Sequence, residues 1–146
     1  MTPMQAIDTN ILVYAHREEY PQHGVAEKLL REFAEGNRPW ALAWPCLYEF
    51  LRVVTHPKGL KPMTSLHDAW QNIENLCQSP SLILLHETER HQVILGDLLR
   101  QFPVSGNLIH DAHIAALLLE HGVHEIITAD SDFKKFKPIK MIDPFS

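Results

Sequence analysis

Acidic residues at particular places in this sequence are its best candidates for chemistry. Asp8 directly follows a short apolar segment, Asp130 follows the segment Ile126-Ile127-Thr128 by two positions, and Glu49 and Asp111 lie on predicted helices between them. Converging carboxylates repel one another unless cations neutralise them, and oxygen-only ligands select hard ions such as Mg²⁺ or Mn²⁺ over zinc. Such an ion deprotonates a water and orients it at a phosphorus atom, so the acids suggest metal-dependent hydrolysis of phosphodiester bonds.

Short apolar strands and helices alternate along almost the whole chain. We expect strands at residues 4–7, 40–43, 81–85, 125–128 and 139–142, and helices at residues 11–15, 22–35, 45–56, 65–78, 87–101, 110–121 and, as a short turn, 132–136. Strands that are apolar on both faces are typical of a parallel sheet covered by helices on both sides. A length of 146 residues fits one domain, and no linker divides the chain. The sequence therefore predicts a single α/β domain over residues 1–146.

The expected sheet brings two of the acids together. In an open parallel sheet, ligands bind at the carboxyl ends of the strands, so Asp8 and Asp130 should lie at the same edge. Each also has a simpler interpretation as the N-cap of the helix that follows it. Glu49 shares a helix face with Arg52, three residues on, and a surface ion pair between them accounts for it equally well.

The position of Asp111 is harder to explain by a purely structural role. His113 and Glu120 are expected on the opposite, polar face of the helix. Asp111 instead points the same way as the apolar arc formed by Ile114, Ala115, Leu117, Leu118 and Leu119. A carboxylate on the apolar side must be paired, protonated or bound to a metal. An N-cap or an internal ion pair remains open as an alternative to the metal.

The composition is that of an ordinary globular protein. Hydrophobic residues make up 45% and charged residues 21%, and no apolar run approaches the length that crosses a bilayer. The N-terminus does not resemble a signal peptide, so we expect a cytoplasmic protein with no membrane contact, and Cys46 and Cys77 as reduced core residues. The net charge of −5 does not exclude a nucleic-acid substrate, because bound divalent cations would offset most of it.

Four blocks of the sequence resemble, in order, the motifs of PIN-domain toxins of the VapC type. Residues 8–15, DTNILVYA, resemble the opening D-T-N-x-L-x-Y-A, and residues 49–52, EFLR, resemble the E-x-x-R helix. Residues 111–116, DAHIAA, match D-x-x-I-A-A, and residues 128–133, TADSDF, match T-x-D-x-D-F. Each block is short, but together they span nearly the whole chain in the family's order.

The resemblance implies a PIN fold, with a central parallel sheet of four or five strands, and an Mg²⁺-dependent endoribonuclease in which Mn²⁺ can substitute. The catalytic acids that it implies are Asp8, Glu49, Asp111 and Asp130. Asp8 and Asp111 match the positions tied most directly to the metal, and Glu49 and Asp130 complete the cluster or orient water. Asn10 and Thr128 match positions that support the acids by hydrogen bonding, and Asp132 is either a fifth contributor or a cap of the next turn.

The resemblance also implies partners. Such toxins act on RNA, usually form homodimers, and are inhibited by a cognate antitoxin that inserts a segment into the active-site groove. The antitoxin commonly carries the DNA-binding function, so this chain is expected to meet DNA only through it.

Basic residues gather beside the Glu49 helix. Arg52, Lys58 and Lys61 lie within ten residues of one another and would hold an RNA backbone, although a solvated loop is an equally good interpretation.

Histidines and tryptophans suggest further sites that we do not favour. Ten histidines include the pairs 110/113 and 121/124, but no cysteine lies nearby to complete a familiar zinc set, so we expect no structural zinc. Trp40, Trp44 and Trp70 could stack on bases, but core packing is the better expectation for all three.

Three other functions fit parts of the pattern. A phosphatase of the haloacid-dehalogenase type also begins with a strand-end aspartate, but it needs a second acid where this chain has Asn10. A PIN or FEN-like nuclease in RNA or DNA processing would use the same acids. A non-catalytic PIN scaffold would not need them all, so the intact set argues against it.

Overall fold

The fold is a parallel sheet between two layers of helices. The computed structural model describes residues 3–146, so Met1 and Thr2 of the expected domain lie outside the described part. All strand pairs are parallel, in the order β3-β2-β1-β4-β5. The strands are β1 (Gln5–Ile7), β2 (Trp40–Ala43), β3 (Leu82–Leu85), β4 (Glu125–Ile127) and β5 (Lys140–Ile142). The predicted α/β architecture is confirmed, with five strands.

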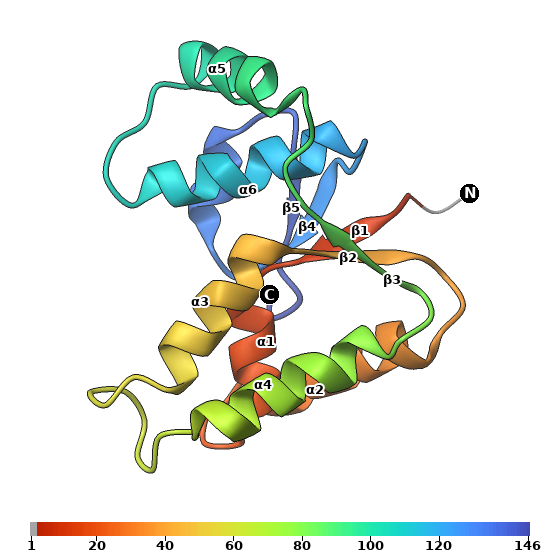
Figure 1. Cartoon of the computed structure of the whole chain (residues 1–146), viewed down its shortest axis with the longest axis vertical. Coiled ribbons are helices and arrows are strands. Elements are labelled where there is room, and N and C mark those ends of the chain that lie inside the picture. The colour runs from red at the N-terminus through yellow and green to blue at the C-terminus, as the bar shows by residue number, and fades with distance from the viewer. Residues whose placement is uncertain (1–2) are drawn as a thin grey trace.

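The helices divide between the two faces of the sheet (Figure 1). One face carries α1 (Thr9–His16), α2 (His23–Glu35), α3 (Trp44–Val54) and α4 (Leu66–Cys77). The other face carries α5 (His91–Gln101), α6 (Leu108–Glu120) and the short 3₁₀ helix η1 (Ser131–Lys135). None of the helices in residues 3–146 is long and apolar enough to cross a membrane.

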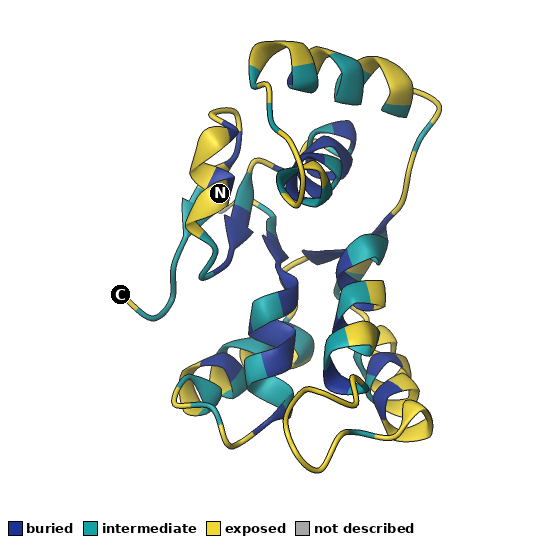
Figure 2. Ribbon diagram, turned by 90° about the vertical axis from the view of Figure 1, so that its left-hand side faces the viewer, coloured by how far each residue is buried: buried dark blue, intermediate teal, exposed yellow. Residues whose placement is uncertain are grey.

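Side chains that alternate along the strands pack into two separate hydrophobic cores, one on each face of the sheet. Ala6, Ala41 and Ile126 belong to the core on the α6 side, whereas their neighbours Ile7, Leu42 and Ile127 belong to the core on the α1 side. Figure 2 shows that the inner strands β1, β2 and β4 are largely buried between the two helical layers, whereas the edge strands β3 and β5 are more exposed. Small strand residues face α6, which presents small residues of its own, so this helix lies close against the sheet and is almost wholly buried.

Local signals start and stop the helices near the predicted places. Asp8 caps α1, Ser65 caps α4 by accepting a hydrogen bond from the Asp68 amide at 3.1 Å, and Pro45 lies in the first turn of α3. Gly122 adopts a φ of +70°, and the Val123 amide donates back to the Leu118 carbonyl at 2.9 Å. That left-handed glycine ends α6 and turns the chain into β4.

Some sequence expectations about burial are wrong. Trp70 is 44% exposed and Cys77 is exposed, because α4 lies at the outside of its layer and only Ala69 and Ile73 of this helix are buried. Glu120, expected on a polar face, is only 5% exposed, since α5 and the segment before it cover that side of α6. Trp40 and Cys46 are buried as expected.

Candidate active site

The first acid, Asp8, lies at the carboxyl end of the central strand β1. Its amide donates to the Ile127 carbonyl at 3.0 Å, which continues the pairing with β4, and its carboxylate accepts from the Thr9 amide at 2.8 Å. Burial raises the pKa of Asp8, and the hydrogen bonds from Thr128 and Thr9 offset this only in part. Asp8 is the N-cap of α1, as the simpler interpretation of the sequence predicted. Its carboxylate also lines the cleft described below.

Thr128 and Asn10 connect the ends of β1 and β4. The fully buried Thr128 hydroxyl donates to Asp8 Oδ2 at 2.7 Å and accepts from Asn10 Nδ2 and from the Asp130 amide, each at 2.9 Å. Asn10 Oδ1 in turn accepts from the Ala129 amide at 3.2 Å. These bonds orient Asp8 and shape the backbone that leads to Asp130.

Glu49 lies on α3 and reaches across to α6. Its Oε2 is 2.8 Å from His110 Nε2, while Oε1 is 3.4 Å from Arg52. The hydrogen bond from His110 lowers the pKa of Glu49, and the same contact raises the pKa of His110. The predicted pairing with Arg52 exists, but the shorter contact aims Glu49 inward.

Asp111 lies in the first turn of α6 and is 8% exposed. Burial and the charges of Asp130 and Asp8 raise its pKa to about 7. The helix N-terminus favours a negative charge here, but not enough to overcome these two effects.

Asp130 caps η1 by accepting from the Asp132 amide at 2.9 Å, so both of these acids lie on one turn beside α6. Asp111, Asp130 and Asp132 each offer an oxygen within 4.8 Å of the other two, close enough to hold a metal ion together. Asp8 lines the same site, but its oxygens are engaged by Thr9 and Thr128.

All the predicted acids line one cleft of about 990 Å³ at the carboxyl edge of the sheet. Residues from α1, α3, α6 and the η1 segment form its walls, including Asp8, Asn10, Glu49, Arg52, His110, Asp111, Asp130 and Asp132. Of the basic residues predicted to bind RNA, only Arg52 lines it. Lys58 and Lys61 lie on the exposed loop between α3 and α4.

The comparison with known families decides what this arrangement belongs to. The family model described as "PIN domain" matches residues 6–137. The chain belongs to the PIN-domain family. The match covers every acid of the cleft, from Asp8 to Asp132.

Curated relatives align with this PIN domain over nearly its whole length. Ribonuclease VapC43 of Mycobacterium tuberculosis H37Rv is 35% identical over 141 residues, which cover 97% of this chain and 95% of the relative. Ribonuclease VapC48 of the same strain is 34% identical over 142 residues, covering 97% and 98%. The resemblance drawn from the motifs is therefore confirmed.

Solved structures share the fold of this PIN domain at low identity. VapBC2 of Rickettsia felis, bound to a DNA fragment from its promoter, superposes with a TM-score of 0.67 at 19% identity, covering 95% of this chain and 97% of that one. VapC20 of Mycobacterium tuberculosis, described as a Sarcin-Ricin loop cleaving toxin, gives 0.65 at 17%, covering 89% and 92%.

The sequence analysis did not place His110 in the PIN-domain cleft. His110 was considered only as a zinc ligand. It contacts Glu49, 61 residues earlier in the chain, and this contact joins α6 to α3. Its place directly before Asp111 was the only available signal, because nothing local reveals a partner so distant.

Proposed function

We propose that this chain is a VapC-type toxin, an Mg²⁺-dependent endoribonuclease that hydrolyses RNA phosphodiester bonds. The observation that carries the proposal is the gathering of five carboxylates, from four separate segments of the chain, in one cleft of a PIN domain. The chain is also 35% and 34% identical, over nearly its full length, to two proteins named VapC ribonucleases, which supports the same activity.

The donor set fits a hard divalent ion. It offers carboxylate oxygens, and the pKa of Asp111 is raised to about 7 partly because Asp130 and Asp8 repel its charge. A bound cation would offset the repulsion between these carboxylates, so the site suits a metal ion better than water alone. Asp8, Asp111 and Asp130 would hold the Mg²⁺, with Asp132 beside them.

The chain's own groups divide the remaining work. When bound, Mg²⁺ supplies charge that lowers the pKa of a water and offsets the charge developing on the phosphate. Glu49, whose pKa His110 holds low, stays ionised and orients a water by accepting its proton in a hydrogen bond. Arg52, at the rim, contacts the RNA backbone, and Lys58 and Lys61 extend that contact along the loop after α3.

The same proposal names the partners. The toxin forms a homodimer in the cytoplasm, a cognate antitoxin occupies the cleft, and DNA is met only through that antitoxin. Toxin–antitoxin complexes among the proteins that share this fold, VapBC2 of Rickettsia felis among them, support the antitoxin.

Cleavage of total cellular RNA by the purified, antitoxin-free protein tests the proposal. We expect discrete fragments with Mg²⁺, none with EDTA, and none from Asp8→Asn or Asp111→Asn variants that keep their circular dichroism spectrum. Asp97→Asn, an exposed acid on α5, is the matched control and should cleave normally. Cleavage that persists in EDTA would contradict the metal mechanism, and Mn²⁺ binding without cleavage of any RNA would favour the scaffold.

A further inference from the structure

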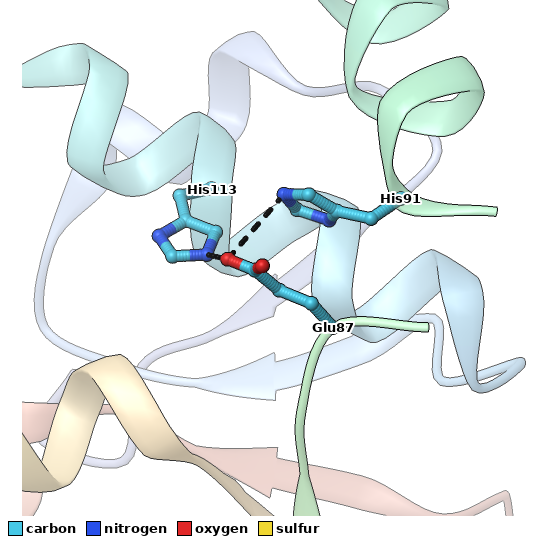
Figure 3. A group of neighbouring side chains, drawn as sticks. All are labelled: Glu87, His91 and His113. Atoms are coloured by element: carbon cyan, nitrogen blue, oxygen red, sulfur yellow. Dashed lines mark hydrogen bonds and ion pairs between the residues drawn. The ribbon is translucent and has the colours of Figure 1, made fainter. Parts of the chain in front are cut away.

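A second group of metal-ligating side chains lies where the segment before α5 meets α6 (Figure 3). Glu87 comes from that segment, His91 is the first residue of α5, and His113 projects from α6. Glu87 Oε1 is 2.9 Å from His113 Nε2 and 3.7 Å from His91 Nε2. The three offer ligand atoms that all lie within 4.8 Å of one another.

A buried carboxylate orients one of these imidazoles. Glu120 Oε2 accepts from His91 Nδ1 at 2.5 Å, while Glu120 Oε1 accepts from the Thr88 amide and hydroxyl at 2.8 and 2.7 Å. Because Nδ1 of His91 is engaged by Glu120, Nε2 is the ring nitrogen that faces Glu87.

This arrangement is the one that metal-binding histidines use. A ligating imidazole almost always donates its other N–H to a carboxylate or carbonyl, which fixes the ring and its tautomer. An ion pair at the surface would need no such support, and it would contribute little to stability with Glu87 57% exposed. A ligand role for His91 thus accounts for the buried Glu120.

We propose that Glu87, His91 and His113 form a second metal site, which takes Zn²⁺ or a similar borderline transition-metal ion. Two imidazole nitrogens and one carboxylate oxygen are a zinc-type set that leaves a further position open. They differ in kind from the carboxylate oxygens of the Asp111 cluster, which suit Mg²⁺. The expectation of no zinc rested on the 110/113 and 121/124 pairs, and the structure places His113 with other partners.

The site would have two consequences. An ion held by these residues would fasten the start of α5 to α6, whose contact otherwise depends on side-chain packing and the Glu120 hydrogen bonds. His113 also lines the cleft that holds the acids. The ion would therefore place positive charge against the wall of the active site, two residues along α6 from Asp111.

Cobalt binding tests this site separately from the acid cluster. Metal-stripped protein is saturated with Mg²⁺, which occupies the oxygen site, and is then titrated with Co²⁺ while visible absorption is recorded. Four-coordinate Co²⁺ absorbs far more strongly than six-coordinate Co²⁺ surrounded by oxygen. We expect one equivalent to give the strong bands, Zn²⁺ to abolish them by displacement, and Zn²⁺ to raise the melting temperature of the wild-type chain.

Matched variants decide the outcome. Glu87→Gln and His113→Gln should lose the strong bands and the Zn²⁺-dependent shift in melting temperature, whereas Asp111→Asn and His67→Gln, a change on the exposed face of α4, should keep both. Circular dichroism checks each fold, and the exposed Glu87 provides the decisive variant if His113→Gln does not fold. Weak six-coordinate absorption in the wild type, or strong bands that survive in Glu87→Gln, would overturn the proposal. RNA cleavage does not enter this test, so its result stands apart from the proposed nuclease.

Discussion

The buried acid Asp111 should destabilise the metal-free protein at neutral pH, so replacing it with asparagine should stabilise the fold. Asparagine has nearly the same shape and is neutral at every pH. The change therefore removes a charge that burial and two neighbouring carboxylates disfavour, while it also removes a proposed metal ligand. Stability and metal binding should move in opposite directions.

The magnitude follows from the pKa of Asp111, which is about 7 in the folded chain against an ordinary value of 3.8. A difference of about 3 pH units corresponds to about 4 kcal/mol at most. Because the cleft is open to solvent, screening reduces this to about 1–2 kcal/mol. The raised pKa means that stability from the neutral carboxyl is fully present below about pH 4 and lost as the pH rises through about 7.

Urea denaturation in EDTA, followed by circular dichroism between about pH 4 and pH 8, measures this effect. We expect Asp111→Asn to unfold with a free energy about 1–2 kcal/mol higher than wild type at about pH 8, and to match it near pH 4. Adding Mg²⁺ should stabilise only the wild type. Asp97→Asn should show no such pH-dependent difference. The reasoning is refuted if Asp111→Asn is no more stable than wild type at pH 8, or if the difference does not change with pH.

Three further changes probe other parts of the structure. Thr128→Val removes a buried hydroxyl that donates to Asp8, so we expect a loss of about 1–3 kcal/mol in urea denaturation, and unchanged stability would contradict this role. His110→Gln removes the contact that lowers the pKa of Glu49, so the acid limb of the pH–rate profile should move to higher pH; an unmoved limb would show that Glu49 does not need its charge. Ile114→Ala opens a cavity in the core beside the sheet and should lower the unfolding free energy by about 2–5 kcal/mol, with a smaller loss meaning that the core collapses around it.

The predicted site residues differ in how far sequence could place them. Asp8 and Asp130 follow strands, so the rule for parallel sheets put them at one edge, and the structure brings them to one cleft. Asp111 was singled out because a carboxylate on an apolar helix face must be paired, protonated or bound to a metal, and it is indeed 8% exposed. Glu49 entered the set only through the family motif, since a local ion pair with Arg52 accounted for it as well.

The burial errors share one physical cause. Helical periodicity shows which residues lie on one face, but not which neighbour covers that face or how far it extends. Trp70 lies on the apolar side of α4 and remains 44% exposed, while Glu120 lies on the polar side of α6 and is enclosed by the segment before α5. Exposure at both positions depends on the position of another helix.

The sequence by itself determined the class of fold and the principal acids, because apolar spacing and strand-end positions are local properties that a chain carries in any conformation. Only the tertiary structure decided the strand order, the contact between Glu49 and His110, and the meeting of Glu87 and His91 with His113. Glu49 and His110 are 61 positions apart and Glu87 and His113 are 26 apart, so long-range packing selects these contacts. The metal chemistry proposed for the chain depends on both: acids that the sequence reveals, and imidazole partners that only the folded chain brings together.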